Sequence, residues 1–171
     1  MARVFITGSS DGLGLMAARL LIDQGHEVVL HGRNEGRSRD ALAAAAGDGE
    51  AVSGDLSTIA GARTVADAVN KLGRFDAVIH NAGLGYRERR VEMEPGVPSL
   101  FAVNVLAPYI LTALIVRPQR LVYLSSGMHR GVRPRMDDLL WGQRPWSGSS
   151  AYAESYAMFC WHLPSLDAGK T

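Results

Sequence analysis

Thr7-Gly8-Ser9-Ser10-Asp11-Gly12-Leu13-Gly14 is the stretch that decides the fold, because of what lies on either side of it. It follows Ala2-Arg3-Val4-Phe5-Ile6, an apolar run with the β-branched and aromatic content of a buried strand. It leads into a helix expected over Leu15 to Gln24. The apolar positions that recur here at helical spacing are Leu13, Met16, Ala17, Leu20 and Leu21.

A glycine turn between a strand and a helix is typical of a nucleotide site. Gly8 permits the tight turn, and Gly12 and Gly14 let the backbone approach a pyrophosphate and pack helix on strand. The N-terminus of the following helix presents N–H groups and a positive dipole end to an anion. An ordinary turn that caps a helix is the alternative, and the flanking strand and helix favour the nucleotide site.

Strand and helix patterns alternate along the rest of the chain. The further expected strands are Glu27 to His31, Ala51 to Ser53, Phe75 to His80 and Arg120 to Ser126. The further expected helices are Glu35 to Ala46, stopped by Gly47, then Ile59 to Leu72, and Val97 to Arg117. This rhythm predicts an α/β fold, a doubly wound parallel sheet with helices on both faces. The long irregular segment from Gly127 to Ser150 is expected to be a binding loop.

Composition limits the class of protein. With 171 residues, 47% of them hydrophobic, the chain can form a single domain with a core. The net charge of +1 gives no field that would attract nucleic acid or an anionic membrane, so neither partner is expected. The single cysteine, Cys160, fits a reducing compartment, and the first apolar run is too short for a signal peptide. A soluble, cytoplasmic protein is therefore predicted.

Polar and small residues follow the expected strands at the edge where a doubly wound sheet binds its ligands. They are Arg33 and Asn34, Asp55 and Leu56, Asn81, Ala82 and Gly83, and Ser125 and Ser126. Together with Thr7 to Gly14, Asn104 with Val105, and Tyr152 before Ala153-Glu154-Ser155, these motifs resemble the short-chain dehydrogenase/reductase family. The resemblance covers residue 2 to about residue 155. The long gap from Ser126 to Tyr152 is most similar to the retinol-dehydrogenase-like branch.

The resemblance implies an oxidoreductase with a Rossmann fold and strand order 3-2-1-4-5, acting by hydride transfer on an alcohol or carbonyl group of a small-molecule substrate. Tyr152 would be the general acid/base, Ser126 would hold the substrate oxygen, and Asn104 would support a proton-relay water through its helix backbone. The cofactor-binding residues that it implies are Thr7, Gly8, Ser10, Asp11, Gly12, Leu13, Gly14, Arg33, Asn34, Asp55, Leu56, Asn81, Ala82 and Gly83. The family often forms homo-oligomers, so a homo-oligomer is a further expectation.

Arg33 bears on the choice of cofactor. A carboxylate after the second strand would bind the adenosine ribose hydroxyls of NAD, whereas a guanidinium suits the 2′-phosphate of NADP. NADP is therefore the expected cofactor, with NAD as the alternative if Arg33 is only a solvated loop residue.

Other candidate residues give weaker signals. The five histidines show no metal-ligand spacing, so no metal is expected. Trp141 and Trp146 either line a hydrophobic pocket or cover the sheet edge.

The chain departs from the family pattern at position 156. The family carries a lysine four residues after its tyrosine, which holds the nicotinamide ribose and favours the phenolate through its positive charge. Tyr156 stands there in this chain, and a phenol offers no positive charge near neutral pH.

Residues 156–171 also lack the apolar helix and strand that the family carries next. Read from the third base of the Tyr156 codon, the bases spanning Met158 to His162 encode Val-Leu-Leu-Ala in every codon choice. These observations suggest the hypothesis that residues 156–171 are an out-of-frame tail on a nucleotide-binding domain of residues 1–155, with the family's C-terminal strands missing. Three readings stay open: an NADP-dependent oxidoreductase, a nucleotide-binding protein with little catalysis, or a non-functional truncated fragment.

Overall fold

The computed structural model of the protein describes residues 1–45 and 49–167, with side chains as far as Met158. It forms two compact units. The first, called here the sheet unit, comprises Met1–Ala82 and Ala107–Leu124. The second, called here the helical unit, comprises Gly83–Leu106 and Ser125–Thr171.

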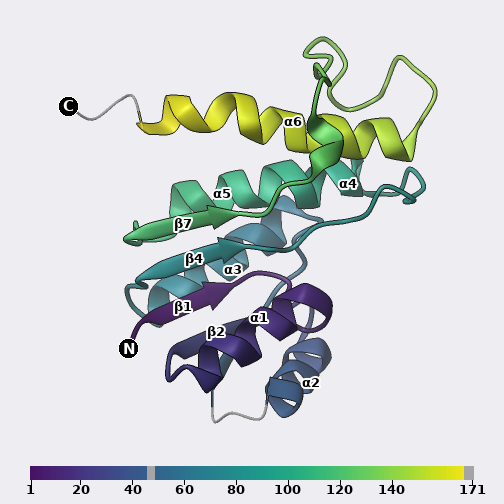
Figure 1. The fold of residues 1–171 in the computed structure, drawn as a ribbon. Coiled ribbons are helices and arrows are strands. Elements are labelled where there is room, and N and C mark those ends of the chain that lie inside the picture. Colours follow the sequence, from purple (N-terminus) through teal and green to yellow (C-terminus); the bar gives the residue numbers. More distant parts are fainter. Residues whose placement is uncertain (46–48, 168–171) are drawn as a thin grey trace. The chain divides into compact units, whose positions relative to one another are not determined.

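The sheet unit contains a five-stranded parallel sheet in the order β3-β2-β1-β4-β7 (Figure 1). Its strands are β1 (Arg3–Ile6), β2 (Glu27–Gly32), β3 (Glu50–Ser53), β4 (Ala77–His80) and β7 (Arg120–Tyr123). Because β7 is the fifth strand of this sheet along the chain, the predicted strand order 3-2-1-4-5 is confirmed. The last strand is shorter than expected, since it ends at Tyr123 rather than Ser126.

Helices cover both faces of this sheet, as a doubly wound fold requires (Figure 1). One face packs on α1 (Gly12–Asp23) and α2 (Glu35–Ala45), and the other on α3 (Ile59–Lys71) and α5 (Ala107–Leu114). Successive side chains of β1 point to opposite faces of the sheet. Val4 and Ile6 therefore pack on the side of α1 and α2, and Phe5 packs on the side of α3 and α5. The predicted stop of α2 at Gly47 lies outside the described residues.

The apolar positions that recur at helical spacing in α1 do not all face the sheet. Leu13, Met16 and Leu20 are 59–70% exposed, whereas Gly14 and Ala18 are buried against the sheet. Small residues face the strands because they let the helix axis come close to the sheet. Apolar residues surround much of this helix, so their spacing alone did not identify the buried side.

The helical unit replaces a predicted continuous helix with several short elements. A hairpin of β5 (Glu92–Glu94) and β6 (Val97–Pro98) precedes α4 (Ser99–Phe101) and a π-helical turn, η1 (Ala102–Leu106). The prediction of a single helix over Val97 to Arg117 was therefore wrong.

A 3₁₀ turn, η2 (Gly127–His129), and the long helix α6 (Gly148–Asp167) complete the helical unit. Helix α6 continues across the proposed boundary between residues 155 and 156, so the first part of the expected tail is helical. Residues 168–171 of that tail lie outside the described part of the chain. Within that described part, no helix is long and apolar enough to cross a membrane.

Candidate functional site

Thr7 joins the ends of two neighbouring strands in the sheet unit. Its hydroxyl oxygen accepts hydrogen bonds from the backbone N–H groups of Asn81 and Ala82, both at 3.0 Å. The Asn81 amide nitrogen returns two bonds, to the carbonyls of Thr7 at 3.0 Å and Gly8 at 2.9 Å. These bonds fix the glycine turn after β1 against the Asn81-Ala82 segment after β4. Two of the motifs named in the sequence, Thr7 to Gly14 and Asn81 to Gly83, therefore lie side by side.

Two glycines make this close approach possible. Gly8 has a φ of +61°, and a Cβ there would lie 2.8 Å from the Ala82 Cα. A Cβ on Gly14 would lie 2.4 Å from both the Asn81 amide nitrogen and the Gly8 carbonyl oxygen. A side chain at either position would displace backbone or the Asn81 amide, so the turn keeps its shape only with glycine.

The N-terminus of α1 is open toward an anion. Gly12 is exposed with a φ of +52°, and a Cβ there would meet nothing within 4 Å. The Asp11 side chain makes no capping bond to α1 and instead forms an ion pair with Arg37. The first-turn N–H groups of α1 therefore receive no cap from Asp11, which leaves them suited to a pyrophosphate. Ser10 is half-buried beside this end, and Leu13 is 70% exposed.

The residues after β2 and β3 lie at the same edge of the sheet. Arg33 is exposed, and Asn34 begins α2 by accepting a bond from the Arg37 backbone N–H at 2.9 Å. Asp55 accepts bonds from the backbone N–H and the hydroxyl of Ser57. Leu56 is 5% exposed and packs in the core, so only its backbone is available to a nucleotide.

A buried histidine lies directly before Asn81. His80 is 4% exposed, and burial lowers its pKa to about 4. Its ring stacks on Tyr123 at a centroid distance of 4.7 Å, and its Nε2 lies 3.2 Å from the Thr112 hydroxyl. No role for His80 was predicted from the sequence, in which nothing marks it as buried and uncharged in an interior strand of the sheet.

Asn104, one of the three catalytic candidates, lies in η1 of the helical unit. Its side chain forms a reciprocal pair with the backbone of Leu84, at 2.8 and 3.1 Å, and donates to the Ser155 hydroxyl at 3.2 Å. Ser155 in turn donates to the Tyr152 carbonyl at 2.7 Å. The Asn104 side chain thus supports the turn of α6 that carries Tyr152, and Gly83 directly precedes its partner Leu84.

The π-helical turn around Asn104 has a cause in the sequence. Pro108 lacks an N–H, so it cannot make the α-helical bond to the Asn104 carbonyl four residues earlier. Such interruptions often accompany functional sites. Pro108 was the signal that the predicted continuous helix passed over.

Ser126 caps η2, and its hydroxyl accepts a bond from the Met128 backbone N–H at 3.3 Å. The 3₁₀ turn that it caps packs against α6, which carries Tyr152. Ser126 and Tyr152 therefore lie on contacting elements of one unit.

Aromatic rings surround Tyr152 on α6. Tyr86 meets its ring edge-on at a centroid distance of 6.0 Å, and Tyr156 does so at 4.9 Å. Burial, the nearby Tyr152 and a hydrogen bond with that residue raise the pKa of Tyr156 to about 12. Tyr156 therefore stays protonated and uncharged over the pH range in which a lysine would carry a positive charge.

A buried ionic network, which was not predicted from the sequence, holds the long loop of the helical unit. Arg144 forms two bonds with the Glu154 carboxylate, at 2.8 and 2.6 Å, and lies 3.3 Å from an Asp138 carboxylate oxygen. Its guanidinium also lies 3.6 Å from the centroid of the Trp141 ring. Asp138 and Glu154 lie 6 and 10 residues from Arg144 in the chain, and their charges alone hinted at the network.

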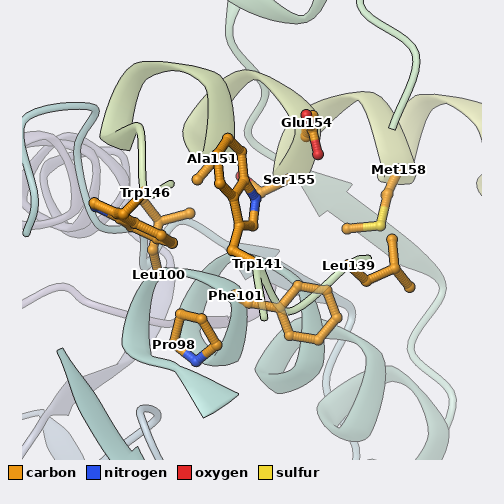
Figure 2. Close-up of a pocket in the computed structure, with 10 residues that line it drawn as sticks. All are labelled: Pro98, Leu100, Phe101, Leu139, Trp141, Trp146, Ala151, Glu154, Ser155 and Met158. Carbon is orange, nitrogen blue, oxygen red and sulfur yellow. The ribbon is translucent and has the colours of Figure 1, made fainter. Parts of the chain in front are cut away.

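The tryptophans of this loop line a small pocket, one of the two roles predicted for them (Figure 2). Trp141 and Trp146 meet edge-on at 5.5 Å on one side, and Ala151, Ser155 and Met158 of α6 lie on another. None of Asn104, Ser126 and Tyr152 lines this pocket. Among the described residues, no group of three or more potential ligand side chains could hold a metal ion.

Comparison with known proteins agrees with this geometry. A family model described as "short chain dehydrogenase" matches residues 2–127. An uncharacterized oxidoreductase of Emericella nidulans is 50% identical over 134 residues, which is 77% of this chain and 52% of that protein. Human retinol dehydrogenase 13 is 30% identical over 168 residues, covering 89% of this chain and 49% of that protein.

A crystal structure of an uncharacterized protein from Mycobacterium paratuberculosis is also similar. It superimposes with a TM-score of 0.83 at 28% sequence identity, over 97% of this chain and 61% of that one. The chain spans about half the length of the two relatives from Emericella nidulans and human.

Proposed function

The chain belongs to the short-chain dehydrogenase family, and from this premise we propose that it is an NADP-dependent oxidoreductase that interconverts an alcohol and a carbonyl compound. The observation that carries the proposal is the cradle in which Thr7 and Asn81 fix the Gly8 turn at the open N-terminus of α1. We extend the proposal to residues 1–155 as the nucleotide-binding domain, to a cytoplasmic location and to a homo-oligomer.

The residues of the cradle fit a dinucleotide. The first turn of α1 would bind the pyrophosphate, with Gly12 allowing close approach and Ser10 and Leu13 beside it. Asp55, the Leu56 backbone and Asn81, with Ala82 and Gly83 after it, would lie along the adenosine side.

Arg33 supports NADP rather than NAD. An exposed guanidinium after β2 matches a 2′-phosphate, which it can bind through a charged and often bidentate contact. Asn34 would hold the start of α2 beside it, where its side chain bonds the Arg37 backbone.

The catalytic residues of the proposal lie in the helical unit. When bound, the nicotinamide supplies or accepts a hydride. Tyr152 would exchange a proton with the substrate oxygen, and the Ser126 hydroxyl would hold that oxygen. The Asn104 side chain holds the Tyr152 turn through Ser155. The Asn104 backbone carbonyl, to which Pro108 cannot donate, would support the relay water.

Tyr156 favours a second candidate function, a nucleotide-binding protein with little turnover. Its phenol stays uncharged and cannot replace the cation that the family carries at this position. Loss of that cation and of its bond to the ribose would each cost several kcal/mol of transition-state stabilisation, or orders of magnitude in rate.

Binding and turnover measured separately distinguish the two candidates. The proposed oxidoreductase requires saturable NADPH binding together with NADPH oxidation in the presence of aldehydes or ketones. Binding without turnover would support the second candidate, and absence of binding to either cofactor would refute both.

A further inference from the structure

His31, at the carboxyl end of β2, joins the ends of three strands. Its Nδ1 lies 3.0 Å from the backbone nitrogen of Gly8, in the turn after β1. Its Nε2 lies 2.9 Å from the carbonyl oxygen of Gly54, directly after β3. The ring is 3% exposed, and both of its nitrogens are therefore used inside the protein.

These two contacts determine where the ring carries its proton. The Gly8 N–H can only donate, so Nδ1 must accept with its lone pair. The Gly54 carbonyl can only accept, so Nε2 must carry the hydrogen and donate it. The other neutral tautomer would oppose a donor to a donor and an acceptor to an acceptor, and a protonated ring would direct an N–H at the Gly8 N–H.

The surroundings of the ring keep it neutral. Burial lowers the pKa of His31 below its ordinary value, and the bond to Gly54 and the charge of Asp55 oppose this effect without overcoming it. From β1 the ring also meets Phe5 edge-on at 6.5 Å, which brings no charge. The exposed Arg33 follows directly after the end of β2.

Backbone bonds tie the same residue to the glycine turn a second time. The His31 N–H donates to the Ser9 hydroxyl at 2.8 Å, and the Ser9 N–H donates to the His31 carbonyl at 3.1 Å. The Ser9 hydroxyl donates to the Ile6 carbonyl at 2.9 Å. The turn that precedes α1 is thus attached to β2 at both Gly8 and Ser9.

We propose that His31, fixed as its neutral Nε2–H tautomer, is a positioning residue for the nucleotide cradle, because it sets the backbone of Gly8 through Nδ1. The proposal rests on the proposed function, since the cradle is taken to bind a dinucleotide. His31 itself touches no nucleotide in this account. It acts through the Gly8 turn, whose position determines how the first turn of α1 meets the pyrophosphate.

Two conservative variants separate the two bonds of the ring. The amide of His31→Asn lies at the position of Nδ1 and can accept from Gly8, whereas that of His31→Gln reaches the position of Nε2 and can donate to Gly54. We expect NADH to bind about threefold more weakly to His31→Asn and about tenfold more weakly to His31→Gln. NADH is the probe because it lacks the 2′-phosphate, which titrates near pH 6.

His26→Asn is the matched control. His26 Nδ1 accepts from the Ala2 backbone N–H at 3.1 Å, before β2 begins and at the opposite end of the sheet from the cradle. This variant is expected to leave NADH binding unchanged. Circular dichroism of each variant checks that it is folded before the titration.

Nitrogen-15 NMR of the ligand-free chain tests the proposal without any nucleotide. We expect the His31 ring to be the Nε2–H tautomer at pH 7.5 and to remain neutral at pH 5.5. An Nδ1–H tautomer, a ring that protonates at the ordinary histidine value, or His31→Gln binding NADH as tightly as His31→Asn would each overturn the proposal. Failure of the unmodified chain to bind either cofactor would instead refute the proposed function, and the NMR result would still decide the role of His31.

Discussion

Replacing Arg144 by methionine tests the buried network that holds the long loop of the helical unit. The side chains of Arg144, Asp138 and Glu154 are 17%, 4% and 10% exposed, so the change leaves two carboxylates buried without their cation. Breaking a buried ion pair in this way costs about 3–5 kcal/mol. The loss of the guanidinium from the Trp141 ring adds to that cost.

Urea unfolding followed by tryptophan fluorescence measures the effect as a change in the free energy of unfolding. For a chain of this size, a loss of about 3–5 kcal/mol corresponds to a fall in Tm of roughly 6–20 °C. The triple variant Arg144→Met, Asp138→Asn, Glu154→Gln should recover most of the loss, because it leaves no unpaired buried charge.

Arg135→Met is the matched control, since the Arg135–Asp137 pair lies on the same loop with both side chains more than half exposed. It should leave the unfolding curve unchanged. Equal unfolding free energies for Arg144→Met and the unmodified chain would refute the assignment of this network as the support of the loop.

Three further predictions follow from single residues. Because burial lowers the pKa of His80 to about 4, its neutral form contributes stability above pH 6.5 that is lost as the pH falls toward 4. Urea unfolding at several pH values should show that the free energy of unfolding falls by about 3 kcal/mol between pH 6.5 and pH 4. His80→Phe should abolish this fall, and an unchanged fall in that variant would show that another group causes it. Tyr156→Lys alone should restore little NADPH oxidation, because the residues after it do not follow the family's sequence, and a rise to robust turnover that Tyr152→Phe abolishes would contradict this. Val122 is 42% exposed on the edge strand β7, so Val122→Thr should lower the binding of a dye specific for apolar surface, whereas unchanged fluorescence would show that the dye binds elsewhere.

The sheet could be predicted from the sequence because the residue patterns that mark its strands are local. Each buried strand is a short apolar run, and the glycine turn, Asn81 and Asp55 each follow a strand end directly. In a parallel sheet these ends meet at one edge, so the chain order of the motifs was enough to bring Thr7 and Asn81 together.

The features that were missed depend on how segments of the chain fold against one another or on competing local signals. The buried side of α1 is set by how closely Gly14 and Ala18 approach the sheet, which apolar spacing does not reveal. Arg144 pairs with Asp138 of its own loop and with Glu154 of α6, and His31 gains its role only when β1 and β3 lie on either side of β2. Burial and pairing of such groups cannot be read from their neighbours in the chain.

The most direct test of the central claim is a fluorescence titration of the chain with NADPH and with NADH at pH 7.5, repeated for Arg33→Asp. The account predicts saturable binding of both, with NADPH bound roughly ten- to a hundredfold more tightly, as one charged phosphate contact of about 1.5–3 kcal/mol provides. Arg33→Asp should narrow or invert that difference. Equal affinities in the unmodified chain would contradict the role of Arg33, and no binding of either nucleotide would contradict the cradle itself.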